Sequence, residues 1–246
     1  MITNDDGAHA KGLRALRHAV SALGQVVVVA PKFEQSGMSH AITIDRPLRH
    51  VDLGDDMHSI DGTPADCVYL ALFEKRFLPR RPDVVLSGIN HGANLGTSVF
   101  YSGTVAGARE AAMRGIPALA LSLLGGEDAD FGPSAACAAD LCAKLLAASK
   151  PAGHAALLNV NFPRGELKGV RVTHVGRQIY EENVIPRRDP GGREYFWIGG
   201  KVTDNGQIDN ADAHAVSDGY VSVTPLELEP TKDEHWEFAK RVAGIL

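Results

Sequence analysis

Residues 83–124 of the 246-residue chain read DVVLSGINHGANLGTSVFYSGTVAGAREAAMRGIPALALSLL. Apolar runs at Asp83–Ser87 and Ala118–Leu124 enclose Gly103–Arg114, a segment whose small and apolar residues recur at helical spacing. A buried strand, a helix and a second buried strand in this order are typical of a parallel βαβ unit. This stretch therefore predicts an α/β fold.

The same alternation continues on both sides of this unit. The further strands are predicted at residues 1–3, Gln25–Ala30 and Ala156–Phe162, and the further helices at Lys11–Leu23, from the cap Thr63 to Phe77, and at Pro133–Ser149. We therefore expect residues 1–165 to form a Rossmann-like, three-layer core with a doubly wound, mostly parallel sheet.

Residues 166–246 have a different pattern and predict additional strands, an extended β-hairpin and a C-terminal helix. The predicted elements are a strand at Gly169–Gly176, a hairpin at Gln178–Gly200 with its turn at Asp189–Gly192, a polar loop at Thr203–Ser217, a strand at Gly219–Leu226 and a helix at Thr231–Leu246. We interpret the hairpin and the helix as an extension of the core.

Composition narrows the classes of function. A formal net charge of -5 and scattered lysines and arginines predict no polymeric nucleic-acid partner. No apolar run approaches the roughly 20 residues of a membrane-spanning helix. The three cysteines form neither an even disulfide set nor a CxxC pair, which favours a reducing compartment. We therefore expect a cytoplasmic protein with no membrane association.

Polar clusters follow the predicted strands, where ligands bind in open parallel sheets. Asp5 and Asp6 come directly after the first strand, and adjacent carboxylates repel one another unless a proton or a cation intervenes. Mg²⁺ and Mn²⁺ prefer oxygen ligands, so the pair suggests a divalent metal site. A turn or capping role for these residues is the alternative.

Three more clusters offer neutral ligands and anion donors. Ser36 lies in the loop after the second strand, and Asn90 and Asn94 lie in the glycine-rich run after the third. Ser102-Gly103-Thr104 opens a helix, whose N-terminal amides favour an anion such as phosphate. Purely structural roles, as turn formers or helix caps, remain the alternative for each cluster.

Six motifs together resemble those of the SurE family of 5'-nucleotidases, in the same order and across nearly the whole chain. They are TNDDG, APxxxQSGMSHAIT, DGTPADCV, LSGINHGANLG, YSGTVAGAREA and DGYVSVTPL. The resemblance implies one divalent ion per subunit, Mg²⁺ or Mn²⁺, held by Asp5, Asp6, Ser36 and Asn90.

The resemblance also implies hydrolysis of nucleoside 5'-monophosphates, with 3'-monophosphates and short polyphosphate as further substrates. It implies a homodimer or homotetramer in which C-terminal arms are exchanged, so we interpret the hairpin and the terminal helix as assembly arms.

The predicted chemistry is direct attack by water, because no Ser-His-Asp pattern or nucleophile elbow accompanies the motifs. Asp5 or Asp6 would accept the proton, while Asn94, Ser102, Gly103 and Thr104 would bind the phosphate. Two rival interpretations are a non-catalytic nucleotide-binding regulator and a receiver-like, Mg²⁺-binding signalling module. The receiver lacks its phosphorylatable aspartate, because the third strand leads into Ser87–Asn90.

Overall fold

The computed structural model describes residues 1–125, 128–148, 155–204, 208–228 and 235–244. Its strands are β1 (Ile2–Thr3), β2 (Val28–Pro31), β3 (His50–Gly54), β4 (Met57–Ile60), β5 (Val85–His91), β6 (Ala118–Leu123), β7 (Leu157–Phe162), β8 (Val170–Val172), β9 (Ile179–Arg188), β10 (Glu194–Asp204) and β11 (Val221–Pro225). Its α-helices are α1 (Lys11–Val20), α2 (Pro64–Phe73), α3 (Gly103–Met113), α4 (Gly132–Ala147), α5 (Asp212–Ser217) and α6 (Trp236–Ala243), with 3₁₀ turns η1 (Ser21–Leu23) and η2 (Gly96–Phe100).

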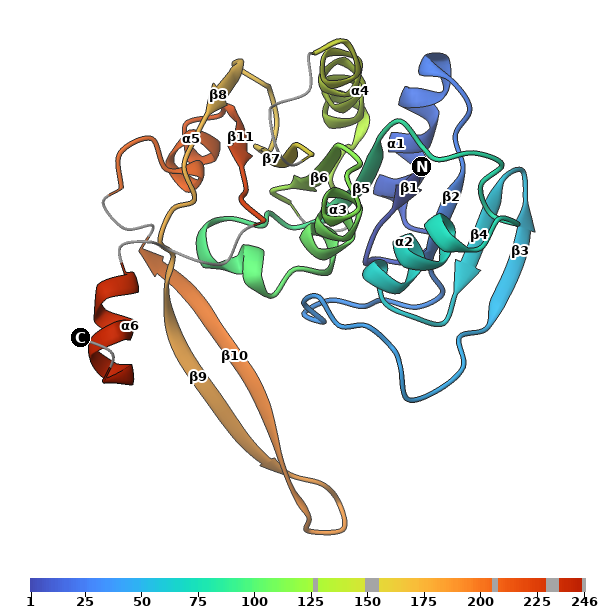
Figure 1. Ribbon diagram of the computed structural model, residues 1–246. Helices are drawn as coiled ribbons and strands as arrows, with labels where there is room; N and C mark the ends of the chain where they lie inside the picture. The colour runs from blue at the N-terminus through green and yellow to red at the C-terminus, as the bar shows by residue number, and fades with distance from the viewer. Residues whose placement is uncertain (126–127, 149–154, 205–207, 229–234, 245–246) are drawn as a thin grey trace.

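A central sheet carries the fold, with the described strands in the order β3-β4-β2-β1-β5-β6-β7-β11-β8. The neighbours from β4 to β7 are parallel, whereas β3 pairs antiparallel with β4, and β11 pairs antiparallel with β7. Helices α1 and α4 cover one face, and α2 and α3 cover the other (Figure 1). The predicted doubly wound α/β fold is confirmed.

Two apolar clusters hold these layers together. One places Leu13 of α1 and Ala138 of α4 against the sheet, and the other places Val68 of α2 and Val105 of α3 against its opposite face. Because both faces are covered, β6 and β7 consist mostly of apolar residues, and all six side chains of β6 are buried.

Local chemistry explains where α2 begins. The Thr63 hydroxyl accepts from the Asp66 amide at 3.1 Å, and the Asp66 carboxylate accepts from the Thr63 amide at 2.9 Å, which completes a capping box around Pro64. The three cysteines are free, and Cys67 and Cys142 are buried among apolar side chains.

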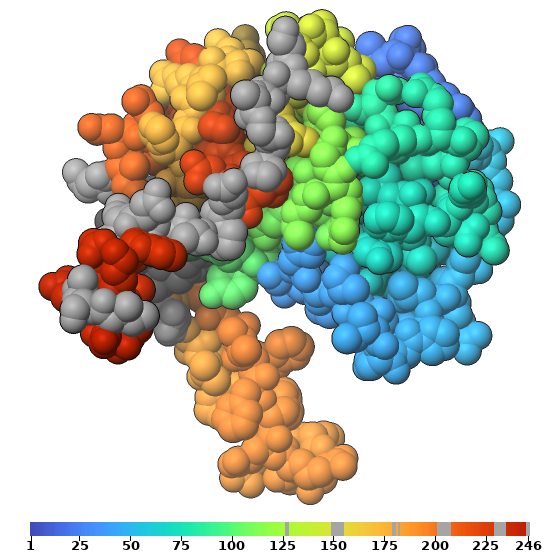
Figure 2. All heavy atoms as spheres, viewed as in Figure 1, coloured from blue at the N-terminus to red at the C-terminus, as the bar shows by residue number. Residues whose placement is uncertain are grey.

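The antiparallel hairpin β9–β10 projects from the body of the molecule, and α6 lies near its base (Figures 1 and 2). The turn is at the predicted place, since the Gly192 amide donates to the Asp189 carbonyl at 2.9 Å. The predicted terminal helix is confirmed for Trp236–Ala243, whereas residues 231–234 and 245–246 lie outside the described residues. Ser149, the predicted last residue of the fourth helix, also lies outside them.

The prediction of a polar loop at Thr203–Ser217 was wrong at both ends. Strand β10 continues to Asp204, and Asp212–Ser217 is the helix α5, while residues 205–207 lie outside the described residues. The pairing of β3 with β4 was also missed, because every residue of β3 lies at the surface and the strand has no apolar run.

Strands β8 and β11 belong to the central sheet, so the segment after residue 165 returns to the core before it reaches α6. The division into a core and assembly arms stays a prediction. Within the described residues, none of the helices combines the length and the apolar character that crossing a membrane requires.

Candidate active site

The carboxyl ends of β1 and β5 bring two of the polar clusters together. The strands are parallel and in register, with Ile2 opposite Leu86. The Asp6 carboxylate accepts from the His91 backbone amide at 3.2 Å and lies 3.3 Å from the His91 imidazole Nδ1. The first loop therefore contacts the end of the strand that carries Asn90.

Asp5 lies beneath this contact, 3% exposed, against the start of α3. Its carboxylate accepts from the Thr104 amide at 3.0 Å and from the Thr104 hydroxyl. Burial raises the pKa of Asp5 to about 6, against the lowering effect of the Thr104 hydroxyl and with a further rise from Asp6. The N-terminus of α3 thus holds a carboxylate as an anion site would.

Gly103 permits this close approach. A Cβ at this position would lie 2.9 Å from the Asp5 Cβ and 3.0 Å from its Oδ2. A side chain here would therefore push α3 away from the carboxylate. Thr104 was predicted as a phosphate ligand, and the structure shows it bonded to Asp5, so any phosphate contact by Thr104 stays a prediction.

The loop that carries Ser36 contacts both the Asp5–Asp6 segment and the residue that precedes Ser102. The Gln35 amide donates to the Asp5 carbonyl at 2.8 Å, and the Ser39 amide donates to the Tyr101 carbonyl at 3.0 Å. Ser36 itself is exposed, and its hydroxyl donates to Glu34 at 2.9 Å. Ser36 is therefore next to a residue that is bonded to the Asp5 backbone.

Asn90 and Asn94 differ in their surroundings. The half-buried Asn90 donates from its Nδ2 to the Gly92 carbonyl at 2.7 Å, a bond that leaves its amide oxygen free to accept. Asn94 is buried, and its Nδ2 donates to the Ser122 hydroxyl at 2.8 Å. Asn94 therefore has one of its two amide hydrogens committed to the core, and its phosphate contact stays a prediction.

Ser102 caps α3, because its hydroxyl accepts from the Val105 amide at 3.1 Å. This is the capping role that the sequence analysis gave as the alternative to phosphate binding. The cap does not move the backbone amides of the first turn of α3, which still lie beside Asp5. The structure thus gathers Asp5, Asp6, Gly103 and Thr104 with the loops of Ser36 and Asn90.

Several supporting residues escaped the sequence analysis. Asn161 accepts from the Asn94 amide at 2.7 Å, and Asp212 accepts from the Gly96 amide at 2.9 Å, so β7 and α5 both hold the glycine-rich loop. These partners are 67 and 116 residues away from the amides that they accept from. No local pattern identifies such pairs.

Buried Glu110 of α3 fixes the position of His40, which follows the Ser36 loop. Its carboxylate lies 2.9 Å from His40 Nε2 and accepts from Arg114 Nε at 2.9 Å. Burial would raise the pKa of Glu110, but the bonds from His40 and Arg114 outweigh it and lower the pKa below 4.5.

We expect Glu110→Gln to lower the free energy of unfolding by about 1.5–3 kcal/mol at neutral pH, the usual value of a hydrogen bond to a charged group. Because the folded-state pKa is lowered, this contribution is present above the unfolded-state pKa and is lost as the pH falls through the folded-state value. Urea unfolding at pH 7 and below pH 4 measures the difference. A wild-type advantage that grows on acidification would contradict the prediction.

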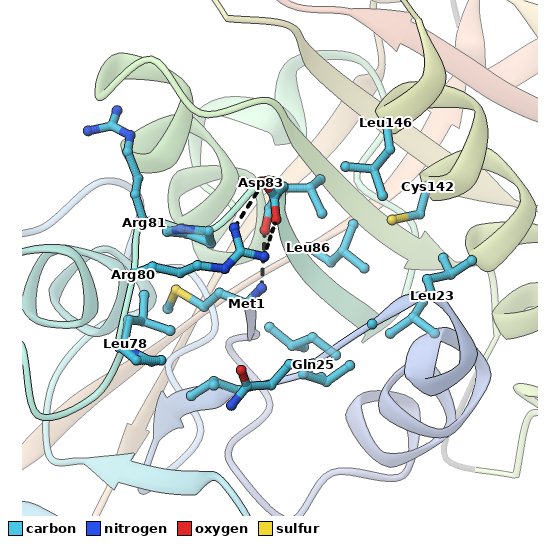
Figure 3. Close-up of a pocket in the computed structure, with 18 residues that line it drawn as sticks. Met1, Leu23, Gln25, Leu78, Arg80, Arg81, Asp83, Leu86, Cys142 and Leu146 are labelled. Atoms are coloured by element: carbon cyan, nitrogen blue, oxygen red, sulfur yellow. Dashed lines mark hydrogen bonds and ion pairs between the residues drawn. The ribbon is translucent and has the colours of Figure 1, made fainter.

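A separate pocket lies at the amino ends of the central strands β1, β2 and β5, opposite the end that carries the candidate site (Figure 3). Leu23, Leu78, Cys142 and Leu146 contribute apolar side chains to it, and Arg80 pairs with Asp83 at 2.9 Å beside it. None of the candidate site residues lines this pocket.

Comparison with known proteins places the chain in a family. The model of the family described as "Survival protein SurE" matches residues 1–182. A protein of Sorangium cellulosum named 5'-nucleotidase SurE is 47% identical, over 100% of this chain and 94% of its own. A Myxococcus xanthus protein of the same name is 48% identical, over 94% of this chain and 88% of its own.

A solved structure agrees with these sequence relationships. The crystal structure of the SurE protein from Aquifex aeolicus superposes with a TM-score of 0.86 at 40% identity and covers 98% of both chains. The family match and the full-length relatives lead to one conclusion: this chain belongs to the SurE family.

Proposed function

We propose that this chain is a metal-dependent phosphomonoesterase that hydrolyses nucleoside 5'-monophosphates to nucleoside and phosphate. The observation that carries the proposal is the place of two adjacent carboxylates, Asp5 at the N-terminus of α3 and Asp6 at the end of β5. This arrangement places two carboxylates for a cation beside backbone amides for an anion. The names of the relatives support the same reaction.

The residues present suit a divalent cation such as Mg²⁺ or Mn²⁺. Within the described part of the chain, neither aspartate forms an ion pair with a lysine or an arginine, although the two carboxylates are adjacent. We propose that Asp5, Asp6, Ser36 and Asn90 hold one ion per subunit. Such an ion would supply charge neutralisation at the phosphoryl group and help to activate water.

The chain's own residues carry the remaining steps of the proposal. Water attacks the phosphorus, the ester P–O bond breaks, Asp5 or Asp6 accepts the proton of the water, and the leaving nucleoside oxygen takes up a proton from solvent. Asn94, Ser102, Gly103 and Thr104 orient the phosphoryl oxygens. The proposal includes nucleoside 3'-monophosphates and short polyphosphate as further substrates. A cytoplasmic location stays a prediction.

The test is phosphate release from a panel of nucleoside 5'- and 3'-monophosphates and short polyphosphate, with Mg²⁺ or Mn²⁺ and with EDTA. Release from 5'-monophosphates that stops in EDTA and returns with added metal supports the proposal. Release that persists in EDTA would rule out the metal, and no release from any substrate would favour a nucleotide-binding protein without activity.

Tyr101 is suited to contact the nucleoside. The residue is 69% exposed although its backbone is held on both sides: its carbonyl accepts from the Ser39 amide at 3.0 Å, and its own amide donates to the Ser98 carbonyl at 3.0 Å. It immediately precedes Ser102, and the neighbouring Phe100 is 63% exposed. Exposed rings beside a phosphate site can stack on a base.

We expect Tyr101→Ala to raise KM for a nucleoside 5'-monophosphate about tenfold, because stacking of one base contributes about 1–3 kcal/mol. Ribose 5-phosphate has no base, so its KM should not change. Phe73→Ala, which removes a ring 59% exposed on α2, is the control variant. An equal rise for both substrates would instead indicate a disturbed phosphate site.

We propose a homodimer or homotetramer in which the β9–β10 hairpin and α6 pack against another subunit. The hairpin exposes Phe196, Trp197 and Ile198, at 61%, 64% and 91%, and α6 exposes Trp236 and Phe238, at 56% and 60%. Figure 2 shows the hairpin as an arm that extends from the body of the molecule. Several exposed apolar side chains gathered on projecting elements favour association with another protein surface.

We expect Ile198→Lys to shift the protein toward the monomer, because a charge would be buried in the interface. Sedimentation velocity over a range of concentrations measures the shift. Val51→Lys, on the exposed strand β3, is the control, and unchanged assembly of Ile198→Lys would contradict the proposed arm.

A further inference from the structure

The antiparallel pair β3–β4 brings together three side chains that the proposed reaction does not use. His50 and Asp52 are two residues apart in β3, so they share one face of the strand. His58 of β4 lies directly opposite Asp52 in the register. Two imidazoles and a carboxylate therefore meet on one face of an edge hairpin.

The distances suit coordination of a metal ion. His50 Nε2 lies 3.1 Å from His58 Nδ1, and His58 Nδ1 lies 3.8 Å from Asp52 Oδ1. Two nitrogens that are each about 2.0–2.1 Å from a tetrahedral ion are about 3.3 Å apart. The imidazole nitrogens thus already have nearly the separation of two metal ligands.

Neighbouring groups hold the rings and the carboxylate in place. Phe77, 5% exposed, packs edge-on against both imidazoles, with ring centroids 5.0 Å from His50 and 5.2 Å from His58. Asp52 Oδ1 accepts from the Gly54 amide at 2.9 Å, which leaves Oδ2 free. Such support reduces the entropy lost when ligands are fixed around an ion.

We propose that His50 and His58 chelate a transition-metal ion such as Zn²⁺, Ni²⁺ or Cu²⁺ at the edge of the sheet, with Asp52 as a third ligand. Within the described residues, no three ligating side chains are already arranged around a common point, so Asp52 must move closer as the ion binds. The ion would cross-link β3 to β4. Strand β2 separates this site from β1 and its aspartates.

The alternative is a pair of histidines that share a hydrogen bond and bind no ion. Isothermal titration of the full chain with Zn²⁺, and electron paramagnetic resonance with Cu²⁺, distinguish the two cases. We expect the Cu²⁺ spectrum to show two imidazole nitrogens. His58→Gln should weaken binding at this site about a hundredfold, because a two-point attachment becomes a one-point attachment.

His18→Gln is the matched control, since it removes an exposed histidine from the last turn of α1. It should leave the two-nitrogen signal unchanged. Phosphate release by His58→Gln with Mg²⁺ should equal that of the wild type, so the two proposals succeed or fail separately. Equal Zn²⁺ and Cu²⁺ binding by wild type and His58→Gln would overturn the proposal, and His50→Gln repeats the test if His58→Gln does not fold.

Discussion

Asp6→Asn should lower the turnover of a nucleoside 5'-monophosphate by about 10²–10³-fold, the loss seen when one preorganised electrostatic group is removed from an active site. The substitution removes a charge from the proposed metal site. The side chain keeps its shape, and its amide oxygen can still accept from the His91 amide, which now donates to Asp6 at 3.2 Å. The loss should therefore come from chemistry and metal binding while the fold is retained.

The measurement is phosphate release over a range of Mn²⁺ concentrations, together with the thermal midpoint of both proteins. Asp45→Asn, at an exposed position, is the control and should retain wild-type turnover. Turnover of Asp6→Asn that stays near normal and depends on metal would show that the site lies elsewhere.

Asp212→Ala should lower the free energy of unfolding by about 3 kcal/mol or more, because each buried donor that is left unpaired costs about 1–3 kcal/mol. The carboxylate is fully buried and accepts from the amides of Gly96, Gly176 and Ala213 at 2.9, 2.9 and 2.8 Å. Three segments would lose their common acceptor at once.

Urea unfolding measures this change, and Asp209→Ala is the matched control at an exposed position nearby. Surface substitutions of that kind usually change stability by less than about 0.5 kcal/mol. Since Gly96 ends the glycine-rich loop, turnover should fall as well. Equal stability of Asp212→Ala and Asp209→Ala would mean that solvent replaces the lost acceptor and that α5 does not anchor the loop.

Repeating local patterns were sufficient to predict the core. The runs that became β5, β6 and β7 are rich in apolar residues because helices cover both faces of the sheet, and such runs are visible without any knowledge of distant contacts. The capping residues of α2 and the turn at Asp189–Gly192 were predicted for the same reason, because each depends on neighbours a few residues away. Family membership was also predicted, from six motifs in a fixed order, and the comparisons confirm it.

Packing decided the features that depend on partners far apart in the chain. Helix α5 forms where the sequence predicted a loop, and the carboxylate at its start accepts from amides 116 and 36 residues away. Thr104 turns its amide and hydroxyl to Asp5, 99 residues earlier, because Gly103 lets α3 come close enough. Hydrogen bonds of this kind require a particular distance and direction between two atoms in space. These atoms meet only after the sheet has formed and placed the loops at the carboxyl ends of its strands beside α3 and α5, so the sequence alone could not predict the bonds.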